Sequence, residues 1–408
     1  MKPQIDYDVD ERYLPALLLF PFEKNLEEWQ AAGVTLHLMR RGNSRHQVIF
    51  VKSKLSSHPY KFAIKETTLE FARREIANYH KLRELGIQTL TPVGIVVRHE
   101  EDLAIETPAG IMYQENHTAY VVTLLEDAVL PESVLFGLRF QQDARKEIFD
   151  AIAELFAKCH AKNVYWGDAS LDNLLIKFMR EEHTLGKRRK LVALLADAET
   201  TEITPSLSAQ MKEADIEFFC ESMLWLDEEF QRRGLQRDRL ITLNDIAYLR
   251  ERYNALTEIW NAHKRFDAIT NFNSERHFGR FRKASYADTL LKHLEEHKWY
   301  LSERLKTPVS MREATLDWYA NYFLPVQDLL KKSNFAEYFP DKTELEVYLG
   351  IMENKYYLSE QQKRDVGLSY AIQDFVKRFG IEKRYASSLK KVFKTIIDIT
   401  KEYAKFSR

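Results

Sequence analysis

In the first part of the chain, segments whose apolar residues have the spacing of a β-strand alternate with segments whose apolar residues have the spacing of a helix. Apolar residues alternate with polar ones between residues 34 and 65, which predicts strands joined by a turn at Gly42. Two further strands are predicted at 93–100 and 119–126. Residues 67–85 have a helical period between these strands, with one apolar face formed by Leu69, Ala72, Ile76, Tyr79 and Leu82.

The helical period returns after these strands and dominates the rest of the chain. Residues 144–163 predict a helix that ends near Asn163, a residue that tolerates the left-handed conformation found after helices. A polar turn follows, then two apolar strands around a charged hairpin at 179–190, and from about residue 208 the pattern is almost wholly helical. The predicted buried stripe of the first of these helices is Ile148, Ile152, Leu155, Phe156 and Cys159.

An internal repeat occupies the far end of the chain. Residues 295–318 recur as residues 352–375 at a constant offset of 57, which predicts an all-α domain over 266–408 built on a duplicated helical unit. Ser310 and Glu313 have capping-box spacing ahead of a helix. The identical positions, given by their numbers in the first copy, are Glu296, Lys298, Tyr300, Leu301, Ser302, Glu303, Val309, Ala314 and Asp317.

Two expectations follow for the repeat. Its "YLSE" segment is interpreted as a helix-boundary and packing signature, because repeated helical units repeat their own caps. Its large aromatic side chains are expected to be buried, because each such burial stabilises a fold by roughly 1.5–3 kcal/mol. These side chains are Trp299, Tyr300, Trp318, Tyr356, Tyr357 and Phe375.

Composition and charge exclude several classes of protein. The chain has 408 residues, of which 45% are hydrophobic and 30% charged, as in a globular protein of two or three domains. A net charge of −1 gives no indication of a nucleic-acid partner. Two cysteines suit a reducing compartment, the N-terminus lacks the pattern of a signal peptide, and no apolar run reaches membrane-spanning length. We therefore expect a cytoplasmic protein with no transmembrane segment.

Five polar residues stand in an order that indicates phosphoryl transfer. Lys65 closes a predicted strand, Glu75 lies in the next helix, Asp168 and Asn173 share one loop, and Asp197 ends a later strand. Transfer from ATP requires a lysine for the phosphates, a carboxylate to orient it, hard oxygen ligands for Mg²⁺ and a base for the acceptor hydroxyl. Taken singly, each residue also fits a structural role, such as a strand-edge lysine, a solvated helix carboxylate or a turn residue.

The same residues resemble motifs of the protein-kinase-like superfamily. "FAIK" (62–65) is similar to the strand-lysine motif, "WGDASLDN" (166–173) to the catalytic loop, and "DAE" (197–199) to the metal-binding DFG segment. The resemblance implies that Lys65 binds the α- and β-phosphates of ATP and that Glu75 pairs with it. It also implies that Asp168 is the catalytic base, and that Asn173 and Asp197 hold Mg²⁺.

A more specific resemblance covers nearly the whole chain. An uncharacterised bacterial kinase-like family, usually described beside lipopolysaccharide kinases, carries "RGxSRH", "A-x-R-E", "YWGDxSLxN" and "DAETGE" elements and a paired helical C-terminal region with a "WYLSE"-like element. Here they appear as "RGNSRH" (41–46), "ARRE" (72–75), "YWGDASLDN" (165–173) and "DAETTE" (197–202). The implied fold is α+β, a two-lobed kinase-like fold followed by the helical domain. The expected divisions are a nucleotide-binding lobe at 1–127, a lobe with the catalytic loop at 128–265, and the helical domain at 266–408.

The nucleotide-covering turn departs from the usual kinase pattern. Kinases commonly use two or three glycines there, whereas this segment has Gly42 alone. Arg45 is positioned in sequence to meet a phosphate oxygen by a charge-assisted hydrogen bond. The resemblance therefore adds Gly42 and Arg45 to Lys65 and Glu75 as expected nucleotide-binding residues.

Departures around the catalytic loop narrow the class of acceptor. Trp166 and Gly167 replace the His-Arg pair that precedes the catalytic aspartate, so a phosphorylated activation loop has no arginine partner there. Ser170 stands where serine/threonine protein kinases carry a lysine, and no Ala-Pro-Glu motif follows. Glu199 replaces the glycine of DFG, as in several small-molecule kinases, and is expected to be a further metal ligand. Asp215 fits two readings equally, a brace beneath the catalytic loop or an ordinary carboxylate near a helix start.

The expected function is that of an enzyme using ATP and Mg²⁺. The predicted activity is phosphoryl transfer to a hydroxyl group on a small molecule, a sugar or a lipid-linked glycan. The alternative is a nucleotide-binding pseudokinase whose helical domain binds a protein partner. Retention of the lysine, the base and the metal ligands favours the enzyme.

Overall fold

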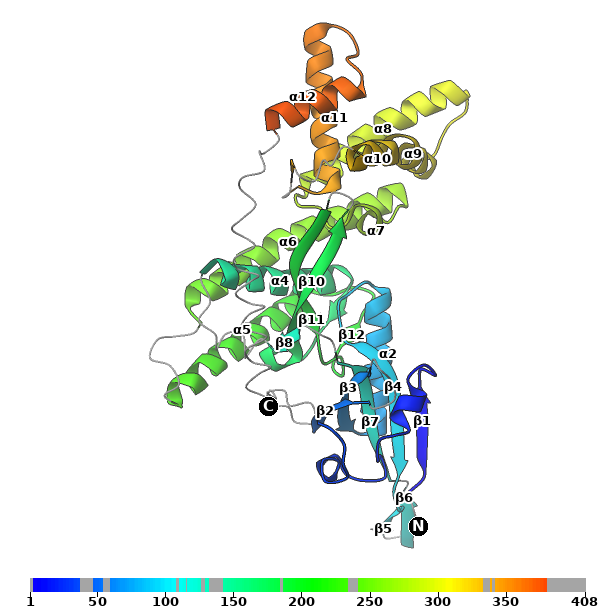
Figure 1. Ribbon diagram of the computed structural model, residues 1–408, viewed down its shortest axis with the longest axis vertical. Helices are drawn as coiled ribbons and strands as arrows, with labels where there is room; N and C mark the ends of the chain where they lie inside the picture. The colour runs from blue at the N-terminus through cyan, green and yellow to red at the C-terminus, as the bar shows by residue number, and fades with distance from the viewer. Residues whose placement is uncertain are drawn as a thin grey trace. The chain divides into compact units, whose positions relative to one another are not determined.

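The structure is a computed structural model (Figure 1), and it describes most of the chain. Among the described residues the chain forms two compact units, one within Met1–Phe178 and Leu191–Tyr253 and the other within Met179–Lys190 and Asn254–Tyr403. The domain divisions expected at 127 and 265 remain predictions. The described residues are 3–36, 47–53, 59–107, 110–114, 116–125, 129–131, 142–183, 186–233, 241–332, 338–339 and 342–379.

The elements confirm the predicted α+β class, with an antiparallel sheet near the N-terminus and a helical C-terminal region. The strands are β1 (Ile5–Val9), β2 (Val48–Lys52), β3 (Lys61–Thr67), β4 (Thr91–His99), β5 (Leu103–Thr107), β6 (Gly110–Gln114), β7 (His117–Leu124), β8 (Val129–Pro131), β9 (Val164–Tyr165), β10 (Leu174–His183), β11 (Gly186–Leu195) and β12 (Glu202–Ile203). The α-helices are α1 (Leu14–Leu17), α2 (Leu69–Glu84), α4 (Gln142–Ala161), α5 (Ala209–Arg232), α6 (Leu243–Thr270), α7 (Ser274–Phe278), α8 (Ser285–Leu305), α9 (Met311–Trp318), α10 (Leu324–Lys332), α11 (Glu344–Gln362) and α12 (Leu368–Phe379). Two short 3₁₀ turns, η1 (Leu26–Glu28) and η2 (Leu171–Asn173), and one π-helical turn, η3 (Tyr319–Phe323), complete the set.

A five-stranded antiparallel sheet forms the N-terminal part of the first unit. Its strand order is β1-β4-β7-β3-β2, so β3 lies between β2 and β7 and holds Lys65 inside the sheet. The edge strand β1, which the hydrophobic pattern did not predict, pairs with β4. At Gly94, where the β4–β7 register shifts, an added Cβ would lie 2.2 Å from the backbone oxygen of Asp8, so β1 crosses at a distance that only glycine permits.

Helix α2 packs on this sheet beside β4 and β7. The Thr68 side chain caps its N-terminus, and Ala72 is buried against Ile95, Ala119 and Val121. Most of the predicted apolar face is buried, but two polar residues, Glu75 and Asn78, are buried on the same helix. The buried side of α2 therefore carries polar side chains next to the apolar ones.

The rest of the first unit is built around α4 and α5. The five predicted core residues of α4 are all buried, and Asn163 follows this helix with a φ of 58°, so both expectations are confirmed. The ring of Phe156 contacts Trp166 and Phe219 at centroid distances of 5.4 and 5.3 Å. This packing sets Trp166, which directly follows β9, against α4 and α5.

Both copies of the sequence repeat lie in the second unit. Each copy is a helix, a turn and a second helix, α8–α9 and then α11–α12. The first helix ends at a left-handed lysine in both copies, Lys306 (φ 55°) and Lys363 (φ 49°), which are 57 residues apart. The capping box of Ser310 and Glu313 is present at the start of α9.

The "YLSE" segment closes both turns in the same way. The Ser302 hydroxyl accepts a hydrogen bond from the backbone N–H of Val309 at 3.1 Å, and Ser359 accepts one from Val366 at 3.3 Å. The interpretation of this segment as a helix-boundary signature is therefore confirmed. Within the described residues, no helix has the length and apolar character needed to cross a bilayer.

The expectation that the aromatic residues of the repeat are buried is wrong for four of the six. Trp318 and Phe375 are buried, at 3% and 6% exposure. The adjacent pairs on α8 and α11 are exposed, because the inward face of those helices is already occupied by leucines such as Leu301 and Leu358. The exposed residues are Trp299 (60%), Tyr300 (66%), Tyr356 (65%) and Tyr357 (54%).

Candidate functional site

Lys65 lies at the centre of a cluster of carboxylates in the first unit. Its Nζ donates hydrogen bonds to Glu75 Oε2 at 3.0 Å, to Asp197 Oδ2 at 2.8 Å and to Glu199 Oε2 at 3.0 Å. An ammonium group has three hydrogens, so these three carboxylates satisfy it completely. The Lys65 side chain is only 11% exposed, which strengthens each of these charge pairs relative to pairs in water.

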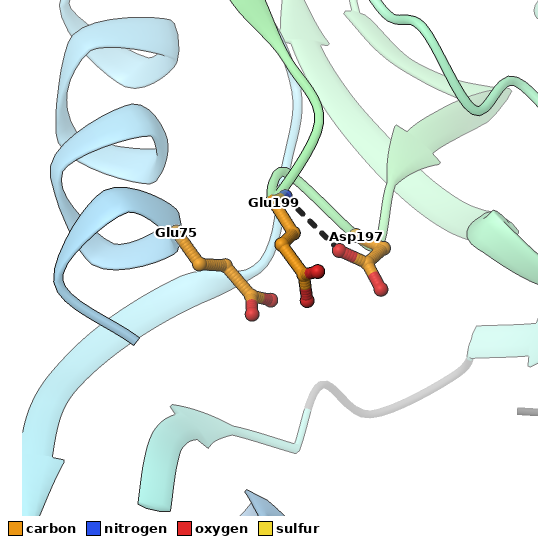
Figure 2. Close-up of side chains that lie close together, drawn as sticks. All are labelled: Glu75, Asp197 and Glu199. Atoms are coloured by element: carbon orange, nitrogen blue, oxygen red, sulfur yellow. Dashed lines mark hydrogen bonds between the residues drawn. The ribbon is translucent and has the colours of Figure 1, made fainter. Parts of the chain in front are cut away.

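The three carboxylates come from two parts of the chain and point toward one another (Figure 2). Glu75 projects from α2, whereas Asp197 and Glu199 follow the end of β11. One oxygen from each lies within 4.8 Å of the others. The backbone N–H of Glu199 donates to Asp197 Oδ1 at 3.0 Å, which fixes the turn that carries both side chains.

Burial and mutual repulsion set the protonation of this cluster. Burial and the negative charge of Asp197 together raise the pKa of Glu75 to about 7, although the positive charge of Lys65 acts in the opposite direction. Burial by itself would lower the pKa of Lys65. The charges of Glu75 and Asp197 outweigh that effect and hold the Lys65 pKa above its ordinary value. Lys65 is therefore charged at neutral pH.

Two buried side chains of α2 bind the segment that carries Asp197. Asn78 Nδ2 donates to the backbone carbonyls of Ala198 and Thr201, both at 2.8 Å. The Tyr79 hydroxyl lies 2.5 Å from the carbonyl of Ala196 and 2.9 Å from Glu75 Oε1. These contacts tie the position of Glu75 to that of the turn at residues 196–201.

Asp168 and Asn173 lie in the loop after β9. The Asn173 amide donates to the backbone carbonyl of Asp168 at 3.0 Å, and η2 supplies the backbone turn between them. The backbone N–H of Ala196 donates to the Asn173 carbonyl at 2.9 Å, immediately before Asp197. The loop and the carboxylate turn are thus neighbouring backbone segments.

Trp166 and Gly167 join these two segments further. Trp166 Nε1 donates to the Asp197 carbonyl at 3.3 Å, and the Thr200 hydroxyl donates to the Trp166 carbonyl at 2.9 Å. Gly167 has a φ of 82°, and an added Cβ would lie 3.1 Å from the Thr200 carbonyl oxygen. Trp166 and Gly167 therefore have a structural role here, because they hold the loop against the turn that carries Asp197.

Asp215 of α5 braces the loop from beneath, which confirms the first of its two expected readings. Its carboxylate accepts hydrogen bonds from the backbone N–H groups of Trp166 at 2.8 Å and Gly167 at 2.9 Å. His160 Nε2 lies 3.2 Å from Asp215 Oδ2, and His160 Nδ1 lies 2.7 Å from the hydroxyl of Tyr253. His160 and Asp215 are both almost completely buried.

The structure brings together some of the residues predicted for the site. Lys65, Glu75, Asp197 and Glu199 form one hydrogen-bonded cluster, and Asp168 and Asn173 form the adjacent loop. The predicted nucleotide-binding residues Gly42 and Arg45 lie outside the described residues. The sequence did not identify Asn78, Tyr79, His160 and Tyr253 as contributors. Asn78 and Tyr79 left a signal, because they stand three and four residues after Glu75 on the same side of a helix.

The carboxylate set fits a divalent cation of the Mg²⁺ type. Mg²⁺ prefers hard oxygen ligands and is commonly held by one or two carboxylates together with substrate phosphates. Asp197 and Glu199 provide two such carboxylates on a fixed turn. Glu75 is engaged by Lys65 and Tyr79, which favours it as an orienting group.

Comparisons with known proteins place the chain as follows. Residues 315–379, which lie in the helical region, match the family described as "Domain of unknown function (DUF4032)". No curated protein matches. The chain is similar to WaaP in complex with acyl carrier protein, with 14% identity and a TM-score of 0.37 over 63% of this chain and 92% of that chain. It is also similar to the Rio2 kinase–ADP/Mg²⁺–phosphoaspartate complex from Chaetomium thermophilum, with 13% identity and a TM-score of 0.30 over 66% of this chain and 74% of that chain.

Proposed function

We propose that the protein is an Mg-ATP-dependent phosphotransferase that acts on a hydroxyl group of a small molecule, a sugar or a lipid-linked glycan. The observation that carries this proposal is the position of Lys65, which comes from an inner strand and is bonded to a helix glutamate and to two carboxylates after β11. A fixed lysine beside hard oxygen ligands is the combination that phosphoryl transfer requires.

Each residue has a proposed role in that reaction. Lys65 would bind phosphate oxygens of ATP while Glu75, held by Tyr79, keeps it oriented. Asp197 and Glu199, with Asn173, would hold Mg²⁺, which when bound neutralises charge that develops on the phosphates. In these roles the Lys65 ammonium would exchange its hydrogen bonds to Asp197 and Glu199 for bonds to phosphate oxygens and would keep the one to Glu75.

Asp168 is the proposed base. It stands on a loop whose backbone is fixed from two sides, by Asp215 at Trp166 and Gly167 and by Asn173 at its own carbonyl. Its carboxylate would accept or orient the proton of the acceptor hydroxyl as the oxygen attacks phosphorus. A base held on such a loop is positioned before the acceptor binds, which lowers the entropic cost of the reaction.

Nucleotide binding is tested first by thermal unfolding. Mg-ATP should raise the Tm of the wild type, because a ligand that binds only the folded state stabilises it. Asp197→Asn should lose the Mg²⁺-dependent part of that rise while its unliganded Tm stays close to that of the wild type. The matched control is Asp102→Asn at an exposed position, which should respond to Mg-ATP as the wild type does. An undiminished rise in Asp197→Asn would remove Asp197 from the proposed metal site.

Turnover is tested separately from binding. Asp168→Asn should bind Mg-ATP with an affinity near that of the wild type but lower the rate by roughly 10²–10⁴, the range for loss of a positioned base. The readout is ATP hydrolysis, together with transfer of labelled γ-phosphate into metabolites of a bacterial extract. Wild-type protein that binds Mg-ATP but shows neither reaction would instead support a nucleotide-binding regulatory protein.

A further inference from the structure

Both copies of the repeat present the same exposed face. It consists of an adjacent aromatic pair with a glutamate three residues before it and another three residues after it. The first copy reads "EHKWYLSE" (296–303) on α8 and the second reads "ENKYYLSE" (353–360) on α11. We call these the aromatic faces of α8 and α11.

The fold does not explain these faces. Contacts inside the unit account for other identical positions, since Leu301 and Leu358 are buried and Ser302 and Ser359 close the turns. The aromatic pairs lie outside this packing and are more than half exposed. Exposure of four large aromatic side chains at equivalent positions is a feature of interaction surfaces.

The two rings of each pair are nearly perpendicular. Trp299 and Tyr300 have centroids 4.8 Å apart and an interplanar angle of 74°, and Tyr356 and Tyr357 have centroids 5.8 Å apart and an angle of 71°. Two perpendicular rings enclose a corner. A compact ligand group fits into such a corner better than a flat one does. On α8 the corner adjoins an open depression of about 570 Å³ lined by the aromatic pair with Glu295 and Glu296.

The charges at these corners favour a cation. The faces of aromatic rings attract positive groups, and aromatic corners are a known means of holding ammonium groups. Glu296 and its counterpart Glu353 are exposed and add negative charge beside each pair. Glu303 is partly compensated by Lys306 at 3.6 Å. Of the two lysines that directly precede the pairs, Lys355 is itself paired with Asp365 at 3.1 Å, whereas Lys298 adds a positive charge beside the first pair.

We propose that the aromatic faces of α8 and α11 dock a basic segment of a partner protein, with one lysine or arginine side chain at each aromatic pair. Duplication of the face makes the contact bivalent, which raises overall affinity when both faces are engaged by one segment. A neutral sugar gains no charge attraction from the flanking carboxylates and stacks best on a flat ring platform, so the charges and the angle between the rings favour the basic peptide.

The test uses the full chain and a short fluorescent peptide rich in lysine and arginine, with a glutamate-rich peptide of equal length as the probe control. Fluorescence anisotropy should show binding of the basic peptide alone, and the affinity should fall as salt increases. The double variant Trp299→Ala/Tyr356→Ala should weaken binding by about tenfold or more. Glu296→Gln/Glu353→Gln should also weaken it, while Tyr370→Ala, at another exposed aromatic residue of the same unit, should not.

Several results would overturn the proposal. Equal affinity of the wild type and both double variants would show that the peptide binds elsewhere. Binding of neutral oligosaccharides that survives Glu296→Gln/Glu353→Gln, with no peptide binding, would assign the faces to a glycan. Loss of a wild-type dimer in the aromatic variant, without peptide binding, would assign them to self-association. Asp197→Asn should bind the peptide normally, so this test stands apart from the proposed enzymatic function.

Discussion

The side-chain amide of Asn78 donates a 2.8 Å hydrogen bond to the backbone carbonyl of Ala198, the residue that follows Asp197. A second hydrogen bond from the same amide reaches the Thr201 carbonyl. Helix α2 therefore holds the carboxylate turn through a side chain that lies three residues from Glu75. In this arrangement Lys65, Glu75 and Asp197 are assembled together without any added group.

Replacement of Asn78 should disturb both stability and the site. Asn78→Ala leaves two buried carbonyls without their donor, which should lower the free energy of unfolding by about 1–3 kcal/mol. The loosened turn should also reduce the rise in Tm that Mg-ATP produces. Chemical denaturation and thermal unfolding with nucleotide measure the two effects. Asn321→Ala, at an exposed position that bonds only Asp317, is the control and should change neither.

The pH dependence of stability should report on Glu75. Its pKa in the folded protein is raised to about 7 from an ordinary value of 4.5, so the native state binds this proton more tightly than the unfolded state does. The resulting stabilisation is fully present below pH 4.5 and is lost as the pH rises through 7, at most by about 1.4 kcal/mol per pH unit. A protonated Glu75 can donate to Tyr79, which then donates to Ala196, so the geometry supports the same direction.

Glu75→Gln removes this titration and keeps an acceptor for Lys65. Its stability relative to the wild type should therefore increase from pH 5 to pH 8, as measured by urea unfolding at both values. Glu70→Gln, an exposed glutamate on the same helix, should show a constant difference. A constant difference for Glu75→Gln as well would mean that Glu75 is ionised throughout this range.

The two copies of the repeat should respond alike to the same change. Ser302→Ala and Ser359→Ala each remove the acceptor of a turn-closing N–H, so each should cost about 1 kcal/mol of unfolding free energy. The two serines share no hydrogen-bond partner, so the costs should add in the double variant within about 0.5 kcal/mol. Thermal and urea unfolding provide the measurement. A cost confined to one copy would show that the turns are not energetically equivalent.

Gly94 should tolerate replacement less well than a glycine that has open space around it. Gly94→Ala places a Cβ 2.2 Å from the Asp8 oxygen at a φ of 143°, so β1 must move away and the cost should reach about 3 kcal/mol. Gly33 has a positive φ of 85° but open space around it, so Gly33→Ala should cost only about 1–2 kcal/mol. If urea unfolding gave the same loss of unfolding free energy for Gly94→Ala and Gly33→Ala, the close approach of β1 would not be what restricts residue 94.

Long, strongly periodic segments were predictable from the sequence, and short ones were not. Helices α2 and α4 and strands β3, β4 and β7 carry patterns of sufficient length, and the repeat offset located α8, α9, α11 and α12. The strand β1 alternates correctly at Ile5, Tyr7 and Val9, but a five-residue alternation has little weight without its partner strand. The burial of the aromatic pairs was predicted wrongly, because hydrophobic area alone does not say which face of a helix its neighbours cover.

The candidate site also contains residues that the sequence made predictable and residues that it did not. The grouping of Lys65 with Glu75 and Asp197, and of Asp168 with Asn173, was predictable because the proposed chemistry fixes their residue types and their order along the chain. Their roles in that chemistry remain predictions. His160 and Tyr253 bond to each other, and nothing in the sequence indicated this pairing. Asn78 and Tyr79 had only their spacing from Glu75, and Asp215 had two equal readings, so the structure was needed to show which backbone groups they bond. Supporting residues of this kind become visible only when the backbone is placed.

Both cysteines of the chain are free and buried, Cys159 in α4 and Cys220 in α5. Burial raises the pKa of Cys220 to about 11 and raises the pKa of Cys159 well above its ordinary value. Because the thiolate is the form that reacts, neither native thiol should be alkylated at neutral pH while the protein is folded. A single cysteine introduced at the exposed Arg304, beside an aromatic face, would therefore accept a maleimide dye selectively, and the wild-type chain can serve as its own background for site-specific labelling.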